Sequence, residues 1–499
     1  MALAPPIIYL LPPLCLLAGS VLILLADVTL PTRAGARPEG GSRLLWWLAL
    51  LSVLASGASS FVAGRDDATR VFAVLAYDPF TAYVWRLILA TLVLVVLISQ
   101  AYIKQNVKES GFFYAALLLF GVGALVLTAC TNTIMLILAV DFLSLVGYVL
   151  TGYLHDDKRS TEAALKYLIY GSAVSAVMAF GLSWLYGITG TADYELTARG
   201  LAGEWVWAPS RTVEPVVLIP MVTFVLAGFA FKIGSAPFHQ WLPDAFEGAP
   251  TPVTASLAII PKVAGFAALV RLTMVMLPET LALGVWWRWP LVAFLAVMGM
   301  FLGNLIGIWQ TNVKRLMAYS GIAQVGYALI AVAVATERSL TALLLYLTVY
   351  AIAEMGAFAA ITVMSTHSRS DDLADYRGLH HRAPILAAAM IVSVLSLFGM
   401  PGTGGFIGKL WLFTAALEAG RGWLIVIAAI NGIISVAYYW KVIQATFVHS
   451  DHSQARVRVP LATMVAVTIA VLTVLVLGVY PNVVLRWAEA AVHGFFSVG

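Results

Sequence analysis

Apolar runs long enough to cross a bilayer recur along almost the whole chain, and they constrain the fold more than any other feature. About 20 helical residues span a hydrocarbon core of about 30 Å, whereas a transmembrane strand needs only about 10. We place such runs near residues 7–28, 43–64, 79–103, 112–131, 133–154, 162–189, 215–236, 250–277, 288–310, 314–336, 339–365, 384–419, 422–446 and 460–480. They predict an all-α polytopic membrane protein with about 14 transmembrane helices and exclude a closed barrel.

The composition agrees with a chain that lies mostly in lipid. Hydrophobic residues make up 61% of the chain and charged residues 11%, against about 25% charged in soluble proteins. The basic residues are scattered among loops, which argues against nucleic-acid binding. Cys15 and Cys130 lie far apart in apolar runs, so neither a disulfide framework nor a metal site is expected. No basic residue precedes Arg33, so the first run is expected to be a retained helix rather than a secretory signal.

Lysine and arginine are distributed unequally between alternating loops. The loops on one side carry Arg33, Arg37, Arg43, Lys104, Lys108, Lys158, Arg159, Lys314, Arg315, Arg369, Arg377, Arg382, Arg456 and Arg458. The loops on the other side carry fewer. The positive-inside rule therefore places the richer side in the cytoplasm and both termini outside.

Two of the apolar runs contain residues that interrupt helices. The first ends in FKIGSAPFHQW, which includes Pro237. The second contains LFGMPGTGGFIGKLW, in which the expected breakers before Lys409 are Pro401, Gly402, Gly404 and Gly405. Proline removes a backbone donor and clashes with the preceding turn, so we expect two discontinuous helices.

Interrupted helices in matching halves of a chain indicate an internal repeat. We predict a first repeat over residues 112–277 (helices 4–8) and a second over 288–446 (helices 9–13). An odd number of crossings inverts the second repeat relative to the first. Residues 1–111 supply helices 1–3, and residues 447–499 supply helix 14.

Several ionisable residues lie within the predicted membrane helices. A lysine at the centre of such a helix costs about 2.5–3.5 kcal/mol on insertion scales, so Lys232 and Lys262 need a reason to be there. Loss of hydration favours the neutral amine, which suits both lysines to release a proton. Asp141 opposes that effect and would titrate jointly with a neighbouring lysine. The alternative is a permanent salt bridge that fixes the helices.

Other candidates are less distinctive. Lys409 follows the second break, where the absence of a preceding strand argues against a phosphate-binding loop. Lys166 is either a functional lysine or part of an interfacial ion pair with Glu162, four residues earlier, and the sequence alone favours neither. Glu354 is a possible relay carboxylate, and His239 is either a proton relay or a cap of the broken helix.

Motifs for covalent chemistry are not found in the sequence. It shows no nucleophile–base constellation, haem ligand pair or iron–sulfur cysteine set. The pairs His380–His381 and His449–His452 have no evident third ligand, so a metal site is not expected there.

The segment FKIGSAPFHQWLPDAFEGAPTPVTASLAIIPKVAGFAALVRL resembles the N subunit (subunit 2) family of respiratory complex I, the proton-pumping NADH:quinone oxidoreductase. VKRLMAYSGIAQVGYALI, YAIAEMGAFAAITVM, LFGMPGTGGFIGKLWLF and NGIISVAYYWKV resemble its later helices. The resemblance covers roughly residues 112–446. GAPTPVTA followed by IIPK separates it from the L and M subunits and from sodium/proton antiporters, which usually carry histidine in that helix.

The resemblance implies a proton pathway through the middle of the membrane. Its residues fall on Asp141, Lys166, Lys232, Lys262 and Lys409. This chain departs from the family at two of the matching positions. Asp141 stands where glutamate is usual, and Gln324 stands where related chains often have histidine.

The resemblance also implies partners and an energy source. NADH, FMN, Fe–S clusters and quinone are expected in other subunits, with no cofactor in this chain. The expected neighbours are an antiporter-like M-type subunit, small K-type and J-type subunits, and the lipid of a bacterial inner membrane. The alternatives are a subunit of a multisubunit sodium/proton antiporter and a structural membrane subunit whose channel is silent.

Overall fold

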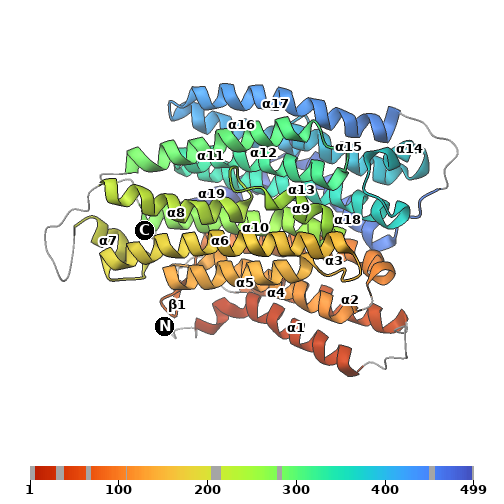
Figure 1. Ribbon diagram of the computed structural model, residues 1–499, viewed down its shortest axis with the longest axis horizontal. Coiled ribbons are helices and arrows are strands. Elements are labelled where there is room, and N and C mark those ends of the chain that lie inside the picture. Colours follow the sequence, from red (N-terminus) through yellow and green to blue (C-terminus); the bar gives the residue numbers. More distant parts are fainter. Residues whose placement is uncertain are drawn as a thin grey trace.

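The computed structural model describes residues 6–29, 39–62, 69–107, 109–203, 215–277, 284–448 and 456–496. Long helices lie roughly side by side, with α1 and α2 at one edge and α17 at the other (Figure 1). Twelve helices in these ranges are long and apolar enough to cross a membrane. The protein is therefore a multi-pass membrane protein, as predicted.

The chain forms three successive groups of helices. The first group is η1 (Pro6–Leu10), α1 (Leu11–Thr29), α2 (Glu39–Val62) and α3 (Pro79–Asn106). The second is α4 (Ser110–Ala129), α5 (Thr133–Thr151), α6 (Lys158–Thr189), α7 (Tyr194–Leu201), α8 (Pro215–Ile233), α9 (Trp241–Gly248), α10 (Thr251–Arg271) and η2 (Leu272–Met276). The third is α11 (Gly284–Gly307), α12 (Val313–Val334), α13 (Glu337–Ser368), η3 (Leu373–Tyr376), α14 (Leu379–Arg382), α15 (Pro384–Phe398), α16 (Gly404–Glu418), α17 (Gly422–Ile443) and η4 (Gln444–Val448).

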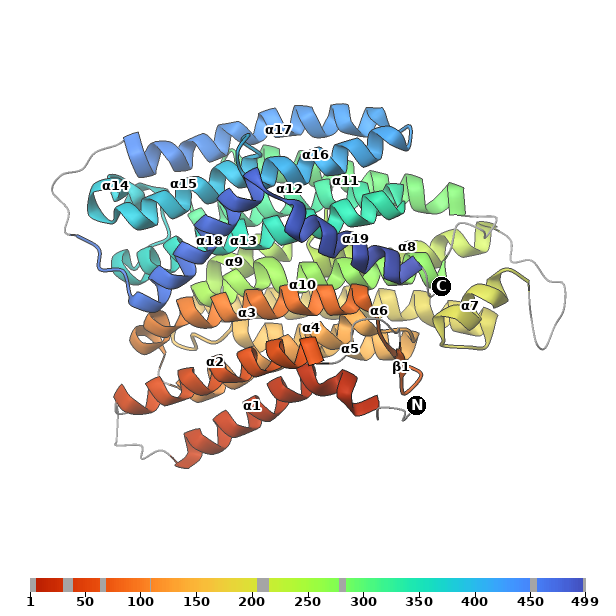
Figure 2. The same ribbon diagram turned by 180° about the vertical axis from the view of Figure 1, so that it is seen from behind.

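The remaining elements are short or terminal. β1 (Thr69–Val71) and β2 (Leu75–Tyr77) form an antiparallel hairpin before α3, with Thr69 opposite Tyr77. α18 (Leu461–Val479) is the last long apolar helix, and α19 (Asn482–Phe496) follows it. α19 continues from the end of α18 and packs on α13 and α3 (Figure 2). The sequence analysis missed α19, although Leu485, Ala488, Val492 and Phe495 recur at helical spacing and are buried.

Two shorter apolar helices in the described ranges raise the number of candidate crossings from twelve to the predicted fourteen. They are Val217–Ile233 and Pro384–Phe398, and each continues after a break into a second half, α9 or α16. Each broken crossing is the fourth of its group of five. The two five-helix units of the predicted fold class are thus present, each with one discontinuous helix.

The first break lies where it was predicted. α8 ends at Ile233 and α9 begins at Trp241, with Pro237 between them. Gly234 has φ 74°, a left-handed conformation that glycine adopts without steric cost. The chain can therefore turn directly after Lys232.

The second break is shorter than predicted. It runs from Gly399 to Thr403, and Gly399 and Gly402 have φ 94° and 89°. The prediction that Gly404 and Gly405 interrupt the helix is wrong, because both lie in the first turn of α16. A Cβ atom on Gly405 would lie 1.7 Å from the backbone carbonyl oxygen of Ser396, so glycine there permits close packing of α16 on α15.

The helices at the centre of the bundle are α10, α12 and α13, which are buried along nearly their whole length. A buried ion pair joins α10 to the start of α3. Arg271 Nη2 lies 2.7 Å from Asp78 Oδ2, and the two side chains are 3% and 6% exposed. Arg271 also donates to Thr81 Oγ1 at 2.8 Å, while Asp78 accepts from the Thr81 backbone nitrogen and caps α3. This pair is a fixed structural contact.

Arg271→Ala is expected to lower the free energy of unfolding by about 3–5 kcal/mol, because it leaves the Asp78 carboxylate buried without its cation. Thermal unfolding of the purified protein in detergent measures the loss. Arg338→Ala is the control, since Arg338 pairs with Glu418 at a surface where the side chains are 48% and 49% exposed. Equal melting temperatures for the two variants would contradict the structural role of Arg271.

Candidate functional site

Lys232 lies in the last turn of α8 and points at α5. Its Nζ donates to Ser144 Oγ at 2.9 Å and to the Val140 carbonyl at 3.4 Å. The side chain is 2% exposed. Asp141, next to Val140, interacts electrostatically with Lys232, while its carboxylate accepts a hydrogen bond from Ser175 of α6. Lys232 and Asp141 are therefore close enough to influence each other without forming a direct ion pair.

Lys166 on α6 has acidic partners other than Asp141. Its Nζ lies 2.8 Å from Glu162 Oε1 and 2.9 Å from Asp244 Oδ2. The interfacial pair with Glu162 that the sequence left open is thus present. Among the described residues no ion pair joins Lys166 to Asp141, although the resemblance places both in one proton pathway.

Asp244 of α9 is a partner that the sequence analysis missed. Its Oδ1 lies 2.6 Å from Arg315 Nη1 of α12, and Arg315 also lies 2.9 Å from Glu247 Oε2. Asp244 therefore links Lys166 in the first five-helix unit to Arg315 in the second. The available signal was an acid directly after the first break, in WLPDAFEG.

Lys262 lies in the middle of α10 and points at α13. Its Nζ donates to Tyr350 Oη at 2.9 Å, and Tyr350 donates to the Ala258 carbonyl at 3.0 Å. A Cβ atom on Gly321 of α12 would lie 2.4 Å from this Nζ, so glycine makes the space that the ammonium group occupies. Lys262 is thus enclosed by three helices.

Lys409 lies in α16 and points back across the second break. Its Nζ donates to the carbonyls of Leu397 and Phe398, at 2.9 and 2.8 Å, in the last turn of α15. The final carbonyls of a helix have no intrahelical partners and carry partial negative charge. The break therefore supplies a cation site for Lys409. Nζ also lies 4.6 Å from the centre of the Tyr327 ring.

A buried polar cluster adjoins Lys409. Gln324 Nε2 donates to the Leu397 carbonyl at 2.8 Å and to Tyr439 Oη at 3.0 Å, and Gln324 Oε1 accepts from the Tyr346 hydroxyl. The Leu397 carbonyl thus accepts from both Gln324 and Lys409. Gln324, which departs from the family pattern, is thus connected to Lys409 through the Leu397 carbonyl.

The clustered tyrosines were missed by sequence reasoning, although one signal was available. Tyr346 and Tyr350 precede Glu354 at intervals of four residues on α13. Residues with this spacing share one face of a helix. That face points toward Lys262 and Gln324.

The two residues predicted as possible relays occupy different surroundings. His239 lies in the first break, with its ring 6.5 Å from that of Tyr319, and its Nδ1 has no hydrogen-bond partner among the described residues. No described contact joins His239 to Lys232. Glu354 is fully buried in α13 and interacts electrostatically with Lys262.

Metal binding finds no support in the described ranges. They contain no group of three or more His, Cys, Asp and Glu side chains that could hold a metal ion. The rings of His380 and His381 lie 3.8 Å apart in α14. His449 and His452 lie outside the described residues.

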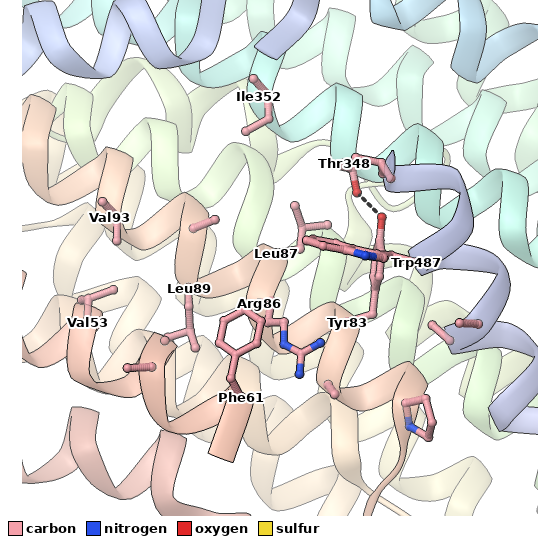
Figure 3. Close-up of a pocket in the computed structure, with 18 of the residues that line it drawn as sticks. Val53, Phe61, Tyr83, Arg86, Leu87, Leu89, Val93, Thr348, Ile352 and Trp487 are labelled. Carbon is pink, nitrogen blue, oxygen red and sulfur yellow. Dashed lines mark hydrogen bonds between the residues drawn. The ribbon is translucent and has the colours of Figure 1, made fainter. Parts of the chain in front are cut away.

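A cavity of about 780 Å³ lies apart from the lysines, between α2, α3, α13, α18 and α19 (Figure 3). It is mostly apolar. Tyr83 and Thr348 share a hydrogen bond of 2.7 Å at its wall, and the Arg86 guanidinium lies 4.3 Å from the centre of the Phe61 ring. None of the five predicted proton-handling residues lines it. We therefore place the candidate site at the lysines and not in this cavity.

The chain resembles known membrane proteins along most of its length. A family model described as the transmembrane region of NADH:quinone oxidoreductase and Mrp antiporters matches residues 130–435. The chain is 36% identical to NADH-quinone oxidoreductase subunit N of Anaeromyxobacter sp. (strain Fw109-5), over 89% of this chain and 90% of the relative. It is 36% identical to NADH-quinone oxidoreductase subunit N 2 of Sorangium cellulosum (strain So ce56), over 95% and 94%.

Solved structures show the same fold. A chain of respiratory complex I from Thermus thermophilus matches with a TM-score of 0.79 and 29% identity, over 96% of this chain and 99% of that one. A chain of the Mrp complex from Dietzia sp. DQ12-45-1b matches with a TM-score of 0.83 but 19% identity, over 99% and 98%, and shows the fold alone. With its two broken helices and buried lysines, the chain belongs to the NADH-quinone oxidoreductase subunit N family of antiporter-like membrane subunits.

Proposed function

We propose that this chain is the proton-translocating N subunit of a bacterial NADH:quinone oxidoreductase. Protons move through a relay of Asp141, Lys166, Lys232, Lys262 and Lys409. The proposal rests on one observation about three of these lysines. Lys232, Lys262 and Lys409 are buried against neutral hydrogen-bond acceptors, namely a serine hydroxyl, a tyrosine hydroxyl and backbone carbonyls.

Neutral acceptors distinguish these lysines from structural charges. A buried salt bridge holds its proton, because loss of the proton would strand a carboxylate in a low-dielectric medium. Arg271 and Asp78 form such a pair. A lysine whose hydrogen bonds go to neutral groups can release its proton without breaking a direct ion pair. This contrast disfavours the alternative in which the lysines only pin helices together.

Electrostatic coupling carries the signal along the relay. Two unit charges about 10 Å apart interact by roughly 1.7 kcal/mol at an effective dielectric constant of about 20. Since about 1.4 kcal/mol is a tenfold change in proton affinity, a charge change at one group alters the proton affinity of another at that separation. We infer that a protonation change at Asp141 and Lys166 alters the proton affinity of Lys232, then that of Lys262, and then that of Lys409. His239, near the first break, is a further step in this proposal.

The energy comes from other subunits in this proposal. NADH, FMN, Fe–S clusters and quinone belong to the partner subunits, where quinone reduction drives the relay, and this chain holds no redox site. An M-type antiporter-like subunit and small K-type and J-type subunits are its membrane neighbours. The chain lies in the bacterial cytoplasmic membrane with both termini on the periplasmic side, and residues 112–277 and 288–446 are its two inverted repeats.

A sodium/proton antiporter subunit is the second candidate, because the family model that matches the chain also covers Mrp antiporters. The identity of 36% to N subunits over most of the chain supports the first candidate. The genes beside this one discriminate between the two, because antiporter genes or quinone oxidoreductase genes would accompany it. Proton pumping that needs sodium but not NADH would favour the antiporter.

Lys232→Ala is expected to reduce NADH-driven acidification of membrane vesicles by at least about tenfold, because it removes the first central proton carrier. NADH oxidation with an artificial acceptor and the amount of assembled complex are measured in the same vesicles. Arg338→Ala, in an exposed pair, is the control. Undiminished pumping per NADH in the assembled Lys232→Ala complex would refute the relay.

Asp141→Asn is expected to lower pumping severalfold, whereas Asp141→Glu should retain most of it. The charge near Lys232 is lost in the first variant and kept in the second. The initial rate of vesicle acidification checks both. If Asp141→Asn pumps at the rate of the unmodified protein, Asp141 has no part in the relay. If the channel is silent, Lys262→Met would also pump at the rate of the unmodified protein.

A further inference from the structure

Glu354 is the most deeply buried acid near the relay, and none of the steps proposed above uses it. It lies in the middle of α13 and is 0% exposed. Neither carboxylate oxygen accepts a hydrogen bond of normal geometry from the described residues, although the Tyr350 hydroxyl lies close enough to interact with the carboxylate. Tyr350 lies one turn earlier, but its hydroxyl donates to the Ala258 carbonyl. An ionised carboxylate buried without hydrogen bonds is strongly disfavoured unless a cation balances it.

Lys262 is the cation that faces Glu354. The two groups interact electrostatically across the interface of α10 and α13. The other titratable groups that interact with Glu354 are Tyr346 and Tyr350 on its own helix and Tyr439 on α17. Lys262 is thus the cation in this part of the described chain that responds directly to the charge of Glu354.

A purely structural role does not account for this glutamate. A structural acid would accept well-formed hydrogen bonds, and Glu354 accepts none of normal geometry from the described residues. A structural ion pair would place Lys262 Nζ on the carboxylate, but Nζ bonds to Tyr350 Oη at 2.9 Å. Tyr350 therefore lies between the amine and the acid, hydrogen-bonded to the first and close enough to interact with the second.

We propose that Lys262 and Glu354, connected through Tyr350, form one proton-loading unit that holds one proton when empty and two when loaded. The proposal deepens the proposed function and rests on it. The empty unit is neutral, as amine with carboxylic acid or as ammonium with carboxylate. The loaded unit is an ammonium with a carboxylic acid and carries one positive charge.

Proton transfer within the unit is balanced at each atom. Lys262 Nζ gives a proton to Tyr350 Oη, and the Tyr350 hydroxyl, after rotating away from the Ala258 carbonyl, gives its own proton to a Glu354 oxygen. One N–H bond is lost and one O–H bond is formed. The proton that loads the unit comes from the side of Lys232 and leaves toward Lys409.

A neutral empty state is an advantage in lipid. A lone lysine in the same place alternates between charged and neutral, and its charged form has no counterion. With Glu354 present, the single shared proton can reside on either group without net charge, so the resting unit has a smaller desolvation penalty. The first half of the chain has a comparable arrangement, since Asp141 interacts with Lys232.

The test uses the assembled complex in native membrane vesicles, with Glu354→Gln, Glu354→Asp and Glu337→Gln. Glu337 is the control, because it lies at the exposed start of the same helix. Among the described residues Glu354 is the anion that acts on Lys262, so Glu354→Gln makes protonation of this lysine require a lower pH. We expect the alkaline limb of the pumping profile to shift down by about one pH unit. Glu354→Asp should restore it, and Glu337→Gln should not change it.

Infrared difference spectra give a second readout that a structural role would not change. The carbonyl stretch of a protonated carboxyl group should respond to pH in the unmodified protein, in Glu354→Asp and in Glu337→Gln. It should be missing from Glu354→Gln. Identical profiles and spectra for Glu354→Gln and Glu337→Gln would overturn the proposal.

Two further variants separate the possible failures. If Lys232→Ala abolishes pumping while Glu354→Gln changes nothing, the relay stands and the two-residue unit is wrong. If Lys232→Ala also pumps normally, the proposed function itself fails. Should Glu354→Gln not assemble, Tyr350→Phe removes the bridging hydroxyl and keeps the acid. It is expected to slow pumping severalfold, and an unchanged rate would contradict the unit.

Discussion

Every backbone N–H and C=O group in hydrocarbon needs a partner within the protein, and the two helix breaks are where this requirement is hardest to meet. At the first break, Ala230 O accepts from Ser235 N, and Phe231 O accepts from Gly234 N and Trp241 Nε1. The freed carbonyls there need no lysine. At the second break, the carbonyls of Leu397 and Phe398 accept from Lys409. Both breaks contain glycine and proline near a lysine, but it is at the second break that the lysine bonds the freed carbonyls.

The structure separates two classes of buried charge. Arg271 is matched to an aspartate and fixes α10 to α3. Lys232 and Lys262 instead contact hydroxyl groups on neighbouring helices, with acids nearby but not in direct contact. A fixed pair contributes stability, whereas a cation on a neutral acceptor can lose its proton without breaking an ion pair. This difference in partners divides the interior into a scaffold and a charge-handling region.

Local signals in the sequence account for much of the fold and less of the site. Apolar runs and Pro237 located the crossings and the first break, because both act on the helix that contains them. Gly404 and Gly405 were misplaced since glycine serves tight packing as well as turning, and only the position of Ser396 distinguishes the two uses. The Asp244 partner of Lys166 could not be predicted in the same way, because it depends on how α9 is rotated toward α6.

The amide of Gln324 bears on how the surroundings of Lys409 respond to a change in its protonation. Its amide makes three hydrogen bonds, two as donor and one as acceptor. A neutral imidazole has one donor and one acceptor, so it cannot replace all three contacts. The Leu397 carbonyl therefore keeps a partner whether or not Lys409 carries its proton. In the proposed relay, an amide that never ionises stands at this position, so proton release at this end rests on Lys409 alone.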